Sequence, residues 1–359
     1  MELSQWKNVH VVVDQSCHAL EVWGVAGVFA PKSSERCMSA QCTPSSRKWC
    51  TIKWILLVVA IIVALLVTFL VGLWIYHPKF VYDPTTFPGV PESKLLSDHG
   101  PTPITILSSD GTKLRAYWLR HPDADKSKTP LTTLLFMHGN TGNLEASFKS
   151  IAGWQRHLPL NALVLSYRGF GYSEGTPLMA GIRMDSQAAL EYLQSERSVD
   201  PKRIILYGHS LGGAVALHLT AANPRSFQAV VVENTFLSIR KMASHDVPAI
   251  AWASFVVTEK WDNEEQLRIL AASDSAPHML FISGAKDNRV PPEHMNQLWA
   301  NAQAIKKGKK NMVLERLHMP ECNHSCYELE GYYEGIVNFL SKTTTSNKAA
   351  PLNKALGAK

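Results

Sequence analysis

Charged residues and cysteines are both scarce in this sequence of 359 residues. Charged side chains make up only 18% of the chain and hydrophobic ones 46%, which excludes an intrinsically disordered protein. Six cysteines are too few for a dense disulfide framework in a chain of this length. The sequence also lacks a repeated unit of solenoid period and a nucleic-acid-binding motif. It therefore predicts a protein that folds around a hydrophobic core.

The net charge of +6 is confined to two short segments. Eight lysines, more than the whole excess, lie in one loop and near the C-terminus: Lys306, Lys307, Lys309, Lys310, Lys342, Lys348, Lys354 and Lys359. The rest of the chain is close to neutral, so we expect no nucleic-acid partner. We expect residues 343–359 to form a basic, flexible tail.

One long apolar run stands out near the N-terminus. Residues 54–76 read WILLVVAIIVALLVTFLVGLWIY, in which Thr68 is the only clearly polar interior residue. This run exceeds the roughly 20 residues that a bilayer-spanning helix needs. Trp54, Trp74 and Tyr76 lie at its ends, where aromatic rings favour the membrane interface. The run begins too deep in the chain for a cleaved signal peptide, so it predicts a transmembrane helix.

Basic residues flank this run unequally. Only Lys79 follows it closely, whereas five basic residues lie just before it, between positions 32 and 53: Lys32, Arg36, Arg47, Lys48 and Lys53. The positive-inside rule therefore predicts a single-pass type II protein of the endoplasmic reticulum or another endomembrane, with its body lumenal or extracellular. Residues 1–53 would form a disordered cytosolic tail. Its cysteines near the membrane are either palmitoylation sites or ordinary thiols: Cys37, Cys42 and Cys50.

Behind a proline-rich linker at 77–100, short apolar runs alternate with helical patterns. Two runs, 104–107 and 114–119, flank the turn dipeptide Asp110-Gly111 and predict a hairpin. Further strands are expected at 131–137, 163–167, 203–207, 229–232, 279–283 and 312–317, and helices at 184–193, 214–222 and 294–304. This order predicts a mostly parallel α/β sheet with helices on both faces, within a domain at 101–342. Such sheets bind ligands at the carboxyl ends of their strands.

A G-x-S-x-G motif follows one of the expected strands. Gly208-His209-Ser210-Leu211-Gly212 stands between the strand-like RIILY and the helix-like AVALHL. This context is the one a nucleophile elbow requires. Side chains at Gly208 and Gly212 would collide with the neighbouring strand or helix, and the serine would occupy a strained turn. The motif predicts a nucleophilic serine at Ser210.

Several further segments extend the pattern. They are HGNTGN (138–143), YRGFGYSEG (167–175), YGHSLGG (207–213), ENTF (233–236), GAKDNRVPP (284–292) and CNHS (322–325). In content and order they resemble the α/β-hydrolase fold, and more closely the membrane-anchored α/β-hydrolase-domain (ABHD) serine hydrolases. The resemblance covers roughly residues 80–342. It implies a Ser-acid-His triad and acylglycerol lipase, lysophospholipid lipase or protein depalmitoylation activity.

The fold's order places an acid and then a histidine after Ser210. Asp287, in a segment that resembles the family's G-x-x-D-x-x-V-P motif, is favoured over Glu233, which ends the preceding strand. His324, just before the last helical pattern, is favoured over His318. Arg168, Tyr167 and Asp185 match the family and are expected to be structural.

The oxyanion hole would use backbone amides. One is the N–H of Leu211, and the resemblance places the other at Asn140, with His138 bracing the loop. Cys322 and Cys326 bracket the histidine and are either paired or free. No metal or organic cofactor is expected.

The sequence leaves two questions open. Residues 247–270, with Trp252 and Phe255, occupy the position of a small cap and would form either an acyl-chain wall over Ser210 or a core helix.

The expected function is cleavage of carboxylic esters or thioesters of lipid-derived substrates at the bilayer, because the anchor keeps the site near it. A peptidase is disfavoured, since no large substrate-selecting domain is present. The alternative is a non-catalytic membrane scaffold that retains the fold.

Overall fold

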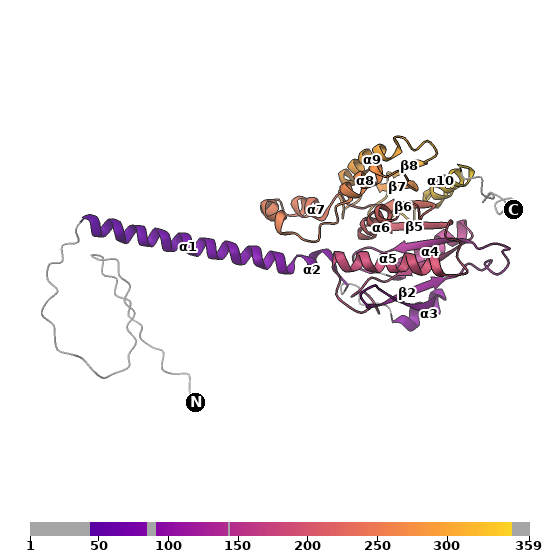
Figure 1. Cartoon of the computed structure of the whole chain (residues 1–359), viewed down its shortest axis with the longest axis horizontal. Coiled ribbons are helices and arrows are strands. Elements are labelled where there is room, and N and C mark those ends of the chain that lie inside the picture. The colour runs from indigo at the N-terminus through magenta and orange to yellow at the C-terminus, as the bar shows by residue number, and fades with distance from the viewer. Residues whose placement is uncertain (1–43, 85–90, 143, 347–359) are drawn as a thin grey trace, which may run out of the picture. The chain divides into compact units, whose positions relative to one another are not determined.

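A computed structural model describes residues 44–84, 91–142 and 144–346 (Figure 1). The chain divides into two compact units, residues 1–64 and 65–359. The predictions for the N-terminal tail up to residue 43, including Cys37 and Cys42, lie outside the described residues. The same holds for the basic tail beyond Ser346.

The apolar run forms one long helix, α1 (Pro44–Tyr76). It begins ahead of the predicted start at Trp54, so residues 44–53, expected to be disordered, are helical. Proline at a helix start is favourable, and no later proline interrupts the segment. Among the described residues, Thr51–Tyr76 is the one stretch long and apolar enough to cross a membrane by length and composition.

An eight-stranded sheet organises the second unit. Its strand order is β1-β2-β4-β3-β5-β6-β7-β8, with β1 and β2 antiparallel to their neighbours and the remaining pairs parallel. The strands are β1 (Thr102–Leu107), β2 (Lys113–Leu119), β3 (Thr132–Met137), β4 (Leu160–Leu165), β5 (Ile204–His209), β6 (Ala229–Glu233), β7 (His278–Gly284) and β8 (Leu314–Met319). The opening hairpin and the parallel sheet confirm the predicted fold class.

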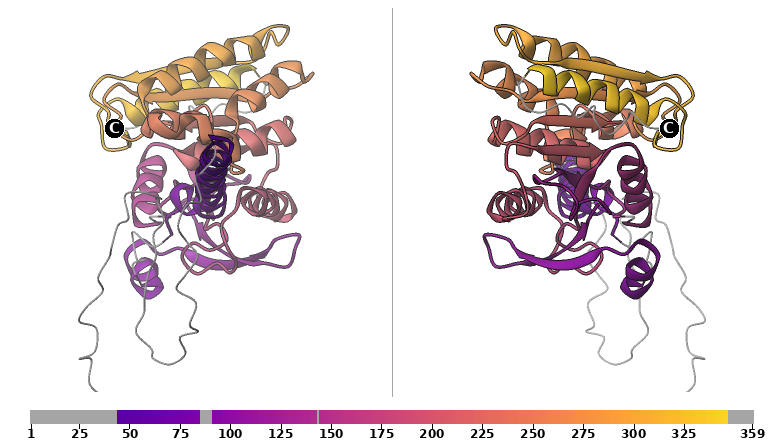
Figure 2. Two further views of the ribbon diagram at one scale, coloured as in Figure 1. Left: turned by 90° about the vertical axis from the view of Figure 1, so that its left-hand side faces the viewer. Right: turned by 90° about the vertical axis from the view of Figure 1, so that its right-hand side faces the viewer.

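Helices cover both faces of the sheet (Figure 2). Alternate residues of β3 enter different cores: Leu135 and Met137 one, Leu134 and Phe136 the other. This alternation follows from the two-residue period of a strand, and continuous burial explains why the central strands are uniformly apolar. The first core includes α5 (Met179–Ser195), α6 (Leu211–Ala222), α8 (Asn263–Ala272) and α9 (Pro292–Lys306), and the second α3 (Glu92–His99), α4 (Leu144–His157) and α10 (Tyr332–Ser346).

Other predicted boundaries also differ from the observed ones. The linker at 77–100 contains two short helices, α2 (Pro78–Val81) and α3. Helix α10 continues four residues into the segment expected to be a flexible tail. The expected cap at 247–270 comprises a 3-10 helix, η1 (Pro248–Val256), and most of α8, whose Leu267 and Leu270 are buried in the core. Burial of α8 makes it part of the helical layer rather than of a cap.

The buried ion pair of Arg168 and Asp185 fastens the loop after β4 to α5. The Arg168 guanidinium donates to Asp185 at 2.7 Å and to Asp110 at 2.7 Å, and the Arg168 backbone N–H donates to Asp185 at 2.9 Å. Asp185 is fully buried, and its hydrogen bond, followed by that of Asp110, raises the pKa of Arg168. A buried charge pair with these added hydrogen bonds serves structure, as the sequence predicts.

Candidate active site

Ser210 lies on a sharp turn between β5 and α6. Its backbone angles are φ 55° and ψ −121°, a region that a non-glycine residue occupies only when the surrounding structure enforces it. The Ser210 N–H donates to the Glu233 carbonyl at 2.9 Å, and the Thr235 hydroxyl donates to the Ser210 carbonyl at 2.7 Å. These bonds from the end of β6 hold the strained turn.

Two glycines allow the turn to form. A Cβ at Gly208 would lie 2.1 Å from the Gly212 carbonyl oxygen, and a Cβ at Gly212 would lie 2.1 Å from the Met137 carbonyl oxygen. Neither backbone atom can move without displacing a central strand or α6. The expected collision with neighbouring elements is therefore present at both positions.

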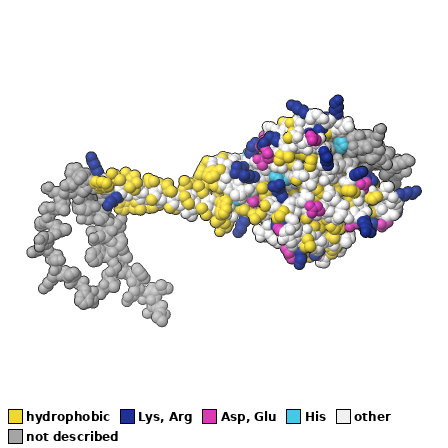
Figure 3. Space-filling view, in the orientation of Figure 1, with side chains coloured by type: hydrophobic (Ala, Val, Ile, Leu, Met, Phe, Trp, Pro, Cys, Tyr) yellow, Lys and Arg dark blue, Asp and Glu magenta, His cyan; other side chains and the backbone are white. Residues whose placement is uncertain are grey.

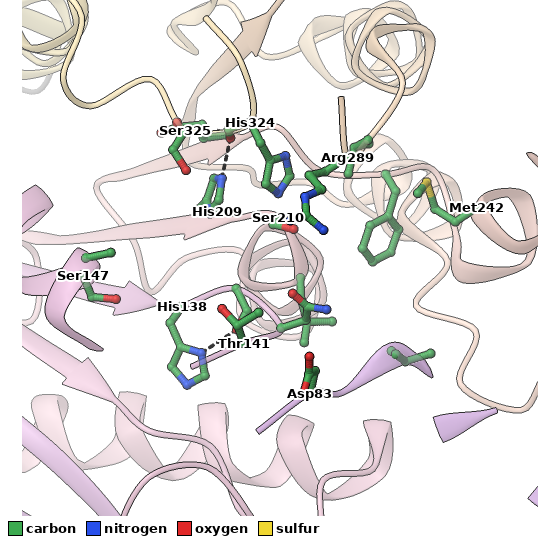
Figure 4. A pocket seen from close by; sticks show the side chains of 18 of the residues that line it. Asp83, His138, Thr141, Ser147, His209, Ser210, Met242, Arg289, His324 and Ser325 are labelled. Atoms are coloured by element: carbon green, nitrogen blue, oxygen red, sulfur yellow. Dashed lines mark hydrogen bonds between the residues drawn. The ribbon is translucent and has the colours of Figure 1, made fainter. Parts of the chain in front are cut away.

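His324 and Asp287 meet beside this turn. The Asp287 carboxylate lies 2.8 and 3.0 Å from His324 Nδ1, so Nδ1 carries the hydrogen and Nε2 is the acceptor nitrogen of the neutral ring. His324 lines the same cavity as Ser210, and Figure 4 shows its ring directed towards the serine. The structure thus brings all three residues predicted for the triad to one site.

Asp287 is a buried carboxylate held by four interactions. Its Oδ1 accepts hydrogen bonds from the backbone N–H groups of Arg289 at 2.8 Å and Val290 at 2.9 Å. Burial raises the pKa of Asp287, but the hydrogen bond and charge of His324 and the two amides outweigh it, so the net shift is downward. Asp287 therefore stays ionised and can stabilise positive charge on the imidazole.

The rival residues occupy other places. His318 lies on β8 with an exposed side chain, 3.3 Å from the Ser283 hydroxyl, and is not among the residues that line the cavity. Glu233 is fully buried at the end of β6, where its carboxylate accepts hydrogen bonds from Tyr207, Tyr332 and the Cys326 backbone N–H. It bonds to the loop that carries His324 rather than to the imidazole.

Two residues hold the backbone of His324. His209 Nε2 lies 2.6 Å from the His324 carbonyl, and Asn234 Nδ2 donates to the same oxygen at 2.9 Å. Asn234 also donates to the Asn323 carbonyl at 3.1 Å and accepts from the Gly284 N–H at 2.8 Å. Sequence reasoning did not assign these roles. The available signal was an asparagine directly after a strand, a residue type that tolerates the positive φ of 43° found here.

Asn234→Gly tests this positioning role. Glycine tolerates the backbone angle and removes only the side chain, so we expect kcat to fall about 10- to 100-fold as His324 loses its alignment, with little change in KM. Steady-state kinetics with a soluble ester would measure the split. A rise in KM at constant kcat would contradict a role in aligning His324.

Cys322 and Cys326 form a disulfide across the His324 loop, with Cα atoms 5.2 Å apart. This settles the alternative that the sequence left open. Asn323, within the bridged loop, has an exposed side chain whose oxygen accepts a hydrogen bond from the Asn288 N–H at 3.2 Å. The bridge and the bonds from Asn234 restrict the loop at several points.

Two backbone segments border the cavity beside Ser210. Leu211 begins α6, and first-turn amides lack acceptors within their own helix, so its N–H is suited to bind an anion. The loop after β3 also approaches the serine: a Cβ at Gly139 would lie 3.6 Å from Ser210 Cβ. Asn140 follows in this loop, lines the cavity, and accepts at its carbonyl a bond of 3.1 Å from the Asp83 N–H.

His138 supports this loop from beneath. Its Nε2 accepts from the Tyr167 N–H at 3.4 Å, so Nδ1 donates to the Gly139 carbonyl at 2.7 Å. Burial lowers the pKa of His138 to about 4, which keeps the ring neutral. Its ring also packs on Tyr167, with centroids 4.0 Å apart. These contacts fit the bracing role that the sequence indicates.

The cavity beside Ser210 has a volume of about 580 Å³. Its apolar lining comes from the segment after α1 and from the region of α7 (Ile239–Asp246), through Phe80, Val81, Phe236, Ile239 and Met242. Figure 4 shows Met242 and Arg289 on one side and Asp83 below the serine. No residue of 247–270 is among the described residues that line it, so this segment does not form a wall over Ser210, and residues of α7 line the cavity instead.

The sequence is similar to curated proteins over most of its length. It is 32% identical to Protein bem46 of Schizosaccharomyces pombe over 290 residues, which cover 77% of this chain and 90% of that protein. It is 34% identical to the α/β-hydrolase domain-containing protein WAV2 of Arabidopsis thaliana over 303 residues, 78% and 90% of the two chains. An uncharacterized membrane protein of Saccharomyces cerevisiae, YNL320W, is 31% identical over 204 residues, covering 57% of this chain and 69% of that protein.

Residues 182–346 match the prolyl oligopeptidase family, Peptidase_S9, which supports a hydrolase. Among solved structures, the Pyrococcus furiosus esterase Pf2001 superimposes with a TM-score of 0.55 at 18% identity, covering 72% of this chain and 98% of the esterase. An α/β-hydrolase from Vibrio vulnificus superimposes with a TM-score of 0.54 at 21% identity, covering 70% of this chain and 86% of that hydrolase. These two structures show a shared fold. Together with the similarity to bem46 and WAV2 over 90% of each protein, they establish that the chain is a member of the family of α/β-hydrolase domain-containing proteins.

Proposed function

We propose that the protein is a membrane-anchored serine hydrolase that cleaves carboxylic esters or thioesters of lipid-derived substrates. The observation that carries the proposal is the meeting, at one cavity, of a strained serine and a histidine bonded to a buried carboxylate. A serine hydroxyl is a weak nucleophile unless an adjacent base removes its proton. Ser210, His324 and Asp287 supply the nucleophile, the base and the group that orients the base.

The reaction proceeds in two halves. His324 Nε2 accepts the Ser210 proton as the oxygen attacks the acyl carbon, and the N–H groups of Leu211 and Asn140 stabilise the tetrahedral oxyanion. Asp287 stabilises the imidazolium, which then protonates the departing alcohol or thiol and leaves an acyl-serine. Water, activated by the same imidazole, hydrolyses the acyl-enzyme and restores Ser210.

Two features favour a lipid-derived substrate. The cavity walls contributed by Phe80, Phe236 and Met242 suit an acyl chain. The apolar helix α1 and the membrane-protein relative suggest membrane association, which brings the site close to acylglycerols, lysophospholipids or S-acylated proteins.

The Cys322–Cys326 disulfide supports a lumenal or extracellular body, as expected for a type II protein, because disulfides persist in oxidising compartments.

A panel of substrates tests the proposal. The full chain, reconstituted in phospholipid nanodiscs, would be assayed on p-nitrophenyl butyrate, a monoacylglycerol, a lysophospholipid and a palmitoyl-thioester peptide. We expect turnover of the soluble ester and of at least one lipid, and its loss in Ser210→Ala. Turnover that survives in Ser210→Ala would refute the mechanism.

The match to the prolyl oligopeptidase family supports a second candidate, a peptidase. Both reactions use the same triad, so the leaving group discriminates between them. Aminoacyl and prolyl p-nitroanilides added to the panel decide the matter: hydrolysis of these amides with no hydrolysis of esters would favour the peptidase. Absence of activity on every substrate would favour the scaffold alternative.

A further inference from the structure

The 3-10 helix η1 lies against the last turns of the apolar helix. The rings of Phe69 and Trp252 contact each other, with centroids 6.4 Å apart. Phe69 stands seven residues before the helix end at Tyr76, which corresponds to about 10 Å along the axis at the usual rise per residue. The Trp252 ring is therefore level with the apolar run and not with its end.

Hydrogen bonds between the residues that follow α1 and those that follow η1 fix the contact between the two helices. The buried His77, which directly follows the helix, bonds through Nδ1 to the Trp74 carbonyl at 2.8 Å. Its Nε2 accepts from the backbone N–H of Thr258 at 3.1 Å and of Glu259 at 3.3 Å, just after η1. Tyr82 donates to the Glu259 carboxylate, and the Trp261 indole donates to Tyr82 at 2.8 Å.

The outer surface of η1 is apolar and exposed. Its sequence, PAIAWASFV, carries no charged residue, yet Trp252 is 55% and Phe255 61% exposed. Such rings on a free surface are costly in water unless something covers them. Figure 3 shows hydrophobic side chains gathered on the end of the body from which the helix leaves.

We propose that η1 is a second membrane-contacting element, with Trp252 and Phe255 inserted among the acyl chains of the leaflet that holds the end of α1. The inference rests on the proposed membrane anchoring. Continuity with the apolar helix identifies the occupant as lipid, because a ring packed on Phe69 shares the surroundings of that residue. Aromatic side chains on short elements commonly insert in this way.

The cavity beside Ser210 is lined in part by the segment that follows α1. Phe80 is 78% exposed and also lines the cavity, and Lys79 beside it extends over the Tyr76 ring with its Nζ 5.3 Å from the centroid. The rim of the cavity thus continues into the surface that would face the bilayer. On this proposal, an acyl chain would enter the cavity from the leaflet past Phe80.

Photolabelling tests the contact directly. The full chain in nanodiscs containing a phospholipid with a diazirine in its acyl chain would be irradiated, digested and mapped by mass spectrometry. We expect labels on peptides from the helix and from residues 248–256. The control is the β1 peptide with Leu107, which is 64% exposed and pairs with β2 at the edge of the sheet. Labelling of η1 no greater than that of β1 would overturn the proposal, as would crosslinks from η1 mainly to a second copy of the chain.

A charged double variant provides the functional test. Trp252 and Phe255 do not line the cavity, so in Trp252→Asp/Phe255→Asp we expect unchanged hydrolysis of a soluble butyrate ester. Hydrolysis of a lipid ester within vesicles should fall about tenfold or more, because two inserted rings are lost. Leu107→Asp is the matched control. Equal rates on vesicle lipid for the double variant and the wild type would contradict the proposal, whereas failure of the proposed catalysis would appear separately as inactivity on the butyrate ester.

Discussion

Replacement of His324 by alanine should lower kcat for ester hydrolysis by about ten-thousandfold to a millionfold, as loss of the base does in other serine triads. His324 is bonded through Nδ1 to Asp287 and directs its other nitrogen towards the Ser210 cavity. Without the imidazole, Ser210 keeps its proton. Single-turnover kinetics with p-nitrophenyl butyrate would measure the acylation step alone.

His318→Ala is the matched control for this variant. His318 stands six positions earlier, is exposed, and contacts Ser283 rather than the cavity. We expect its kcat to stay within about twofold of wild type, because a surface substitution away from the site has little effect. The reverse result, with His318→Ala inactive and His324→Ala active, would contradict the assignment of the base.

Substitution of Gly212 by alanine should prevent the native turn from forming. The added methyl carbon would lie 2.1 Å from the Met137 carbonyl oxygen and 2.7 Å from that of His138. Relief requires α6 to move away from β3, which separates Leu211 from the loop that carries Asn140. We expect destabilisation by more than about 4 kcal/mol, within the exceptional range for a point substitution. Thermal unfolding in detergent would show it as a loss of the folded fraction.

Gly308→Ala is the control, because it measures the cost of backbone strain without a steric collision. Gly308 has a φ of +79°, and no atom lies within 4 Å of its would-be Cβ. We expect a cost of about 1–2 kcal/mol, from the left-handed backbone alone. If Gly212→Ala were no more destabilising than Gly308→Ala, the result would contradict the close packing of the turn at Ser210 against β3.

The fold could be predicted because its central strands are buried on both faces. Runs such as LTTLLFM and RIILYGH are uniformly apolar and end at motifs with glycine, so their type and order were readable. The start of β4 at Leu160 was placed three residues late, since Asn161 interrupts the apolar run. The sequence does not decide whether the residues of α8 belong to a cap or to a core helix, because the buried stripe of this helix is short and its packing partners lie elsewhere in the chain.

The site was predictable where a residue type is rare or belongs to a motif, and not where its role depends on a distant partner. Ser210, Asp287 and His324 stand in recognisable segments. In contrast, the bonds from His209 and Asn234 to the His324 carbonyl join residues 115 and 90 positions apart. Pairing of Cys322 with Cys326 depends on the loop conformation that these bonds hold.

Labelling with a fluorophosphonate probe would show whether Ser210 is an activated nucleophile. The full chain in nanodiscs would be treated as wild type and as Ser210→Ala, with equal amounts of folded, membrane-inserted protein. We predict covalent labelling of the wild type, with the modified peptide containing Ser210, and none of Ser210→Ala. Equal labelling of both proteins, or none of either, would contradict it.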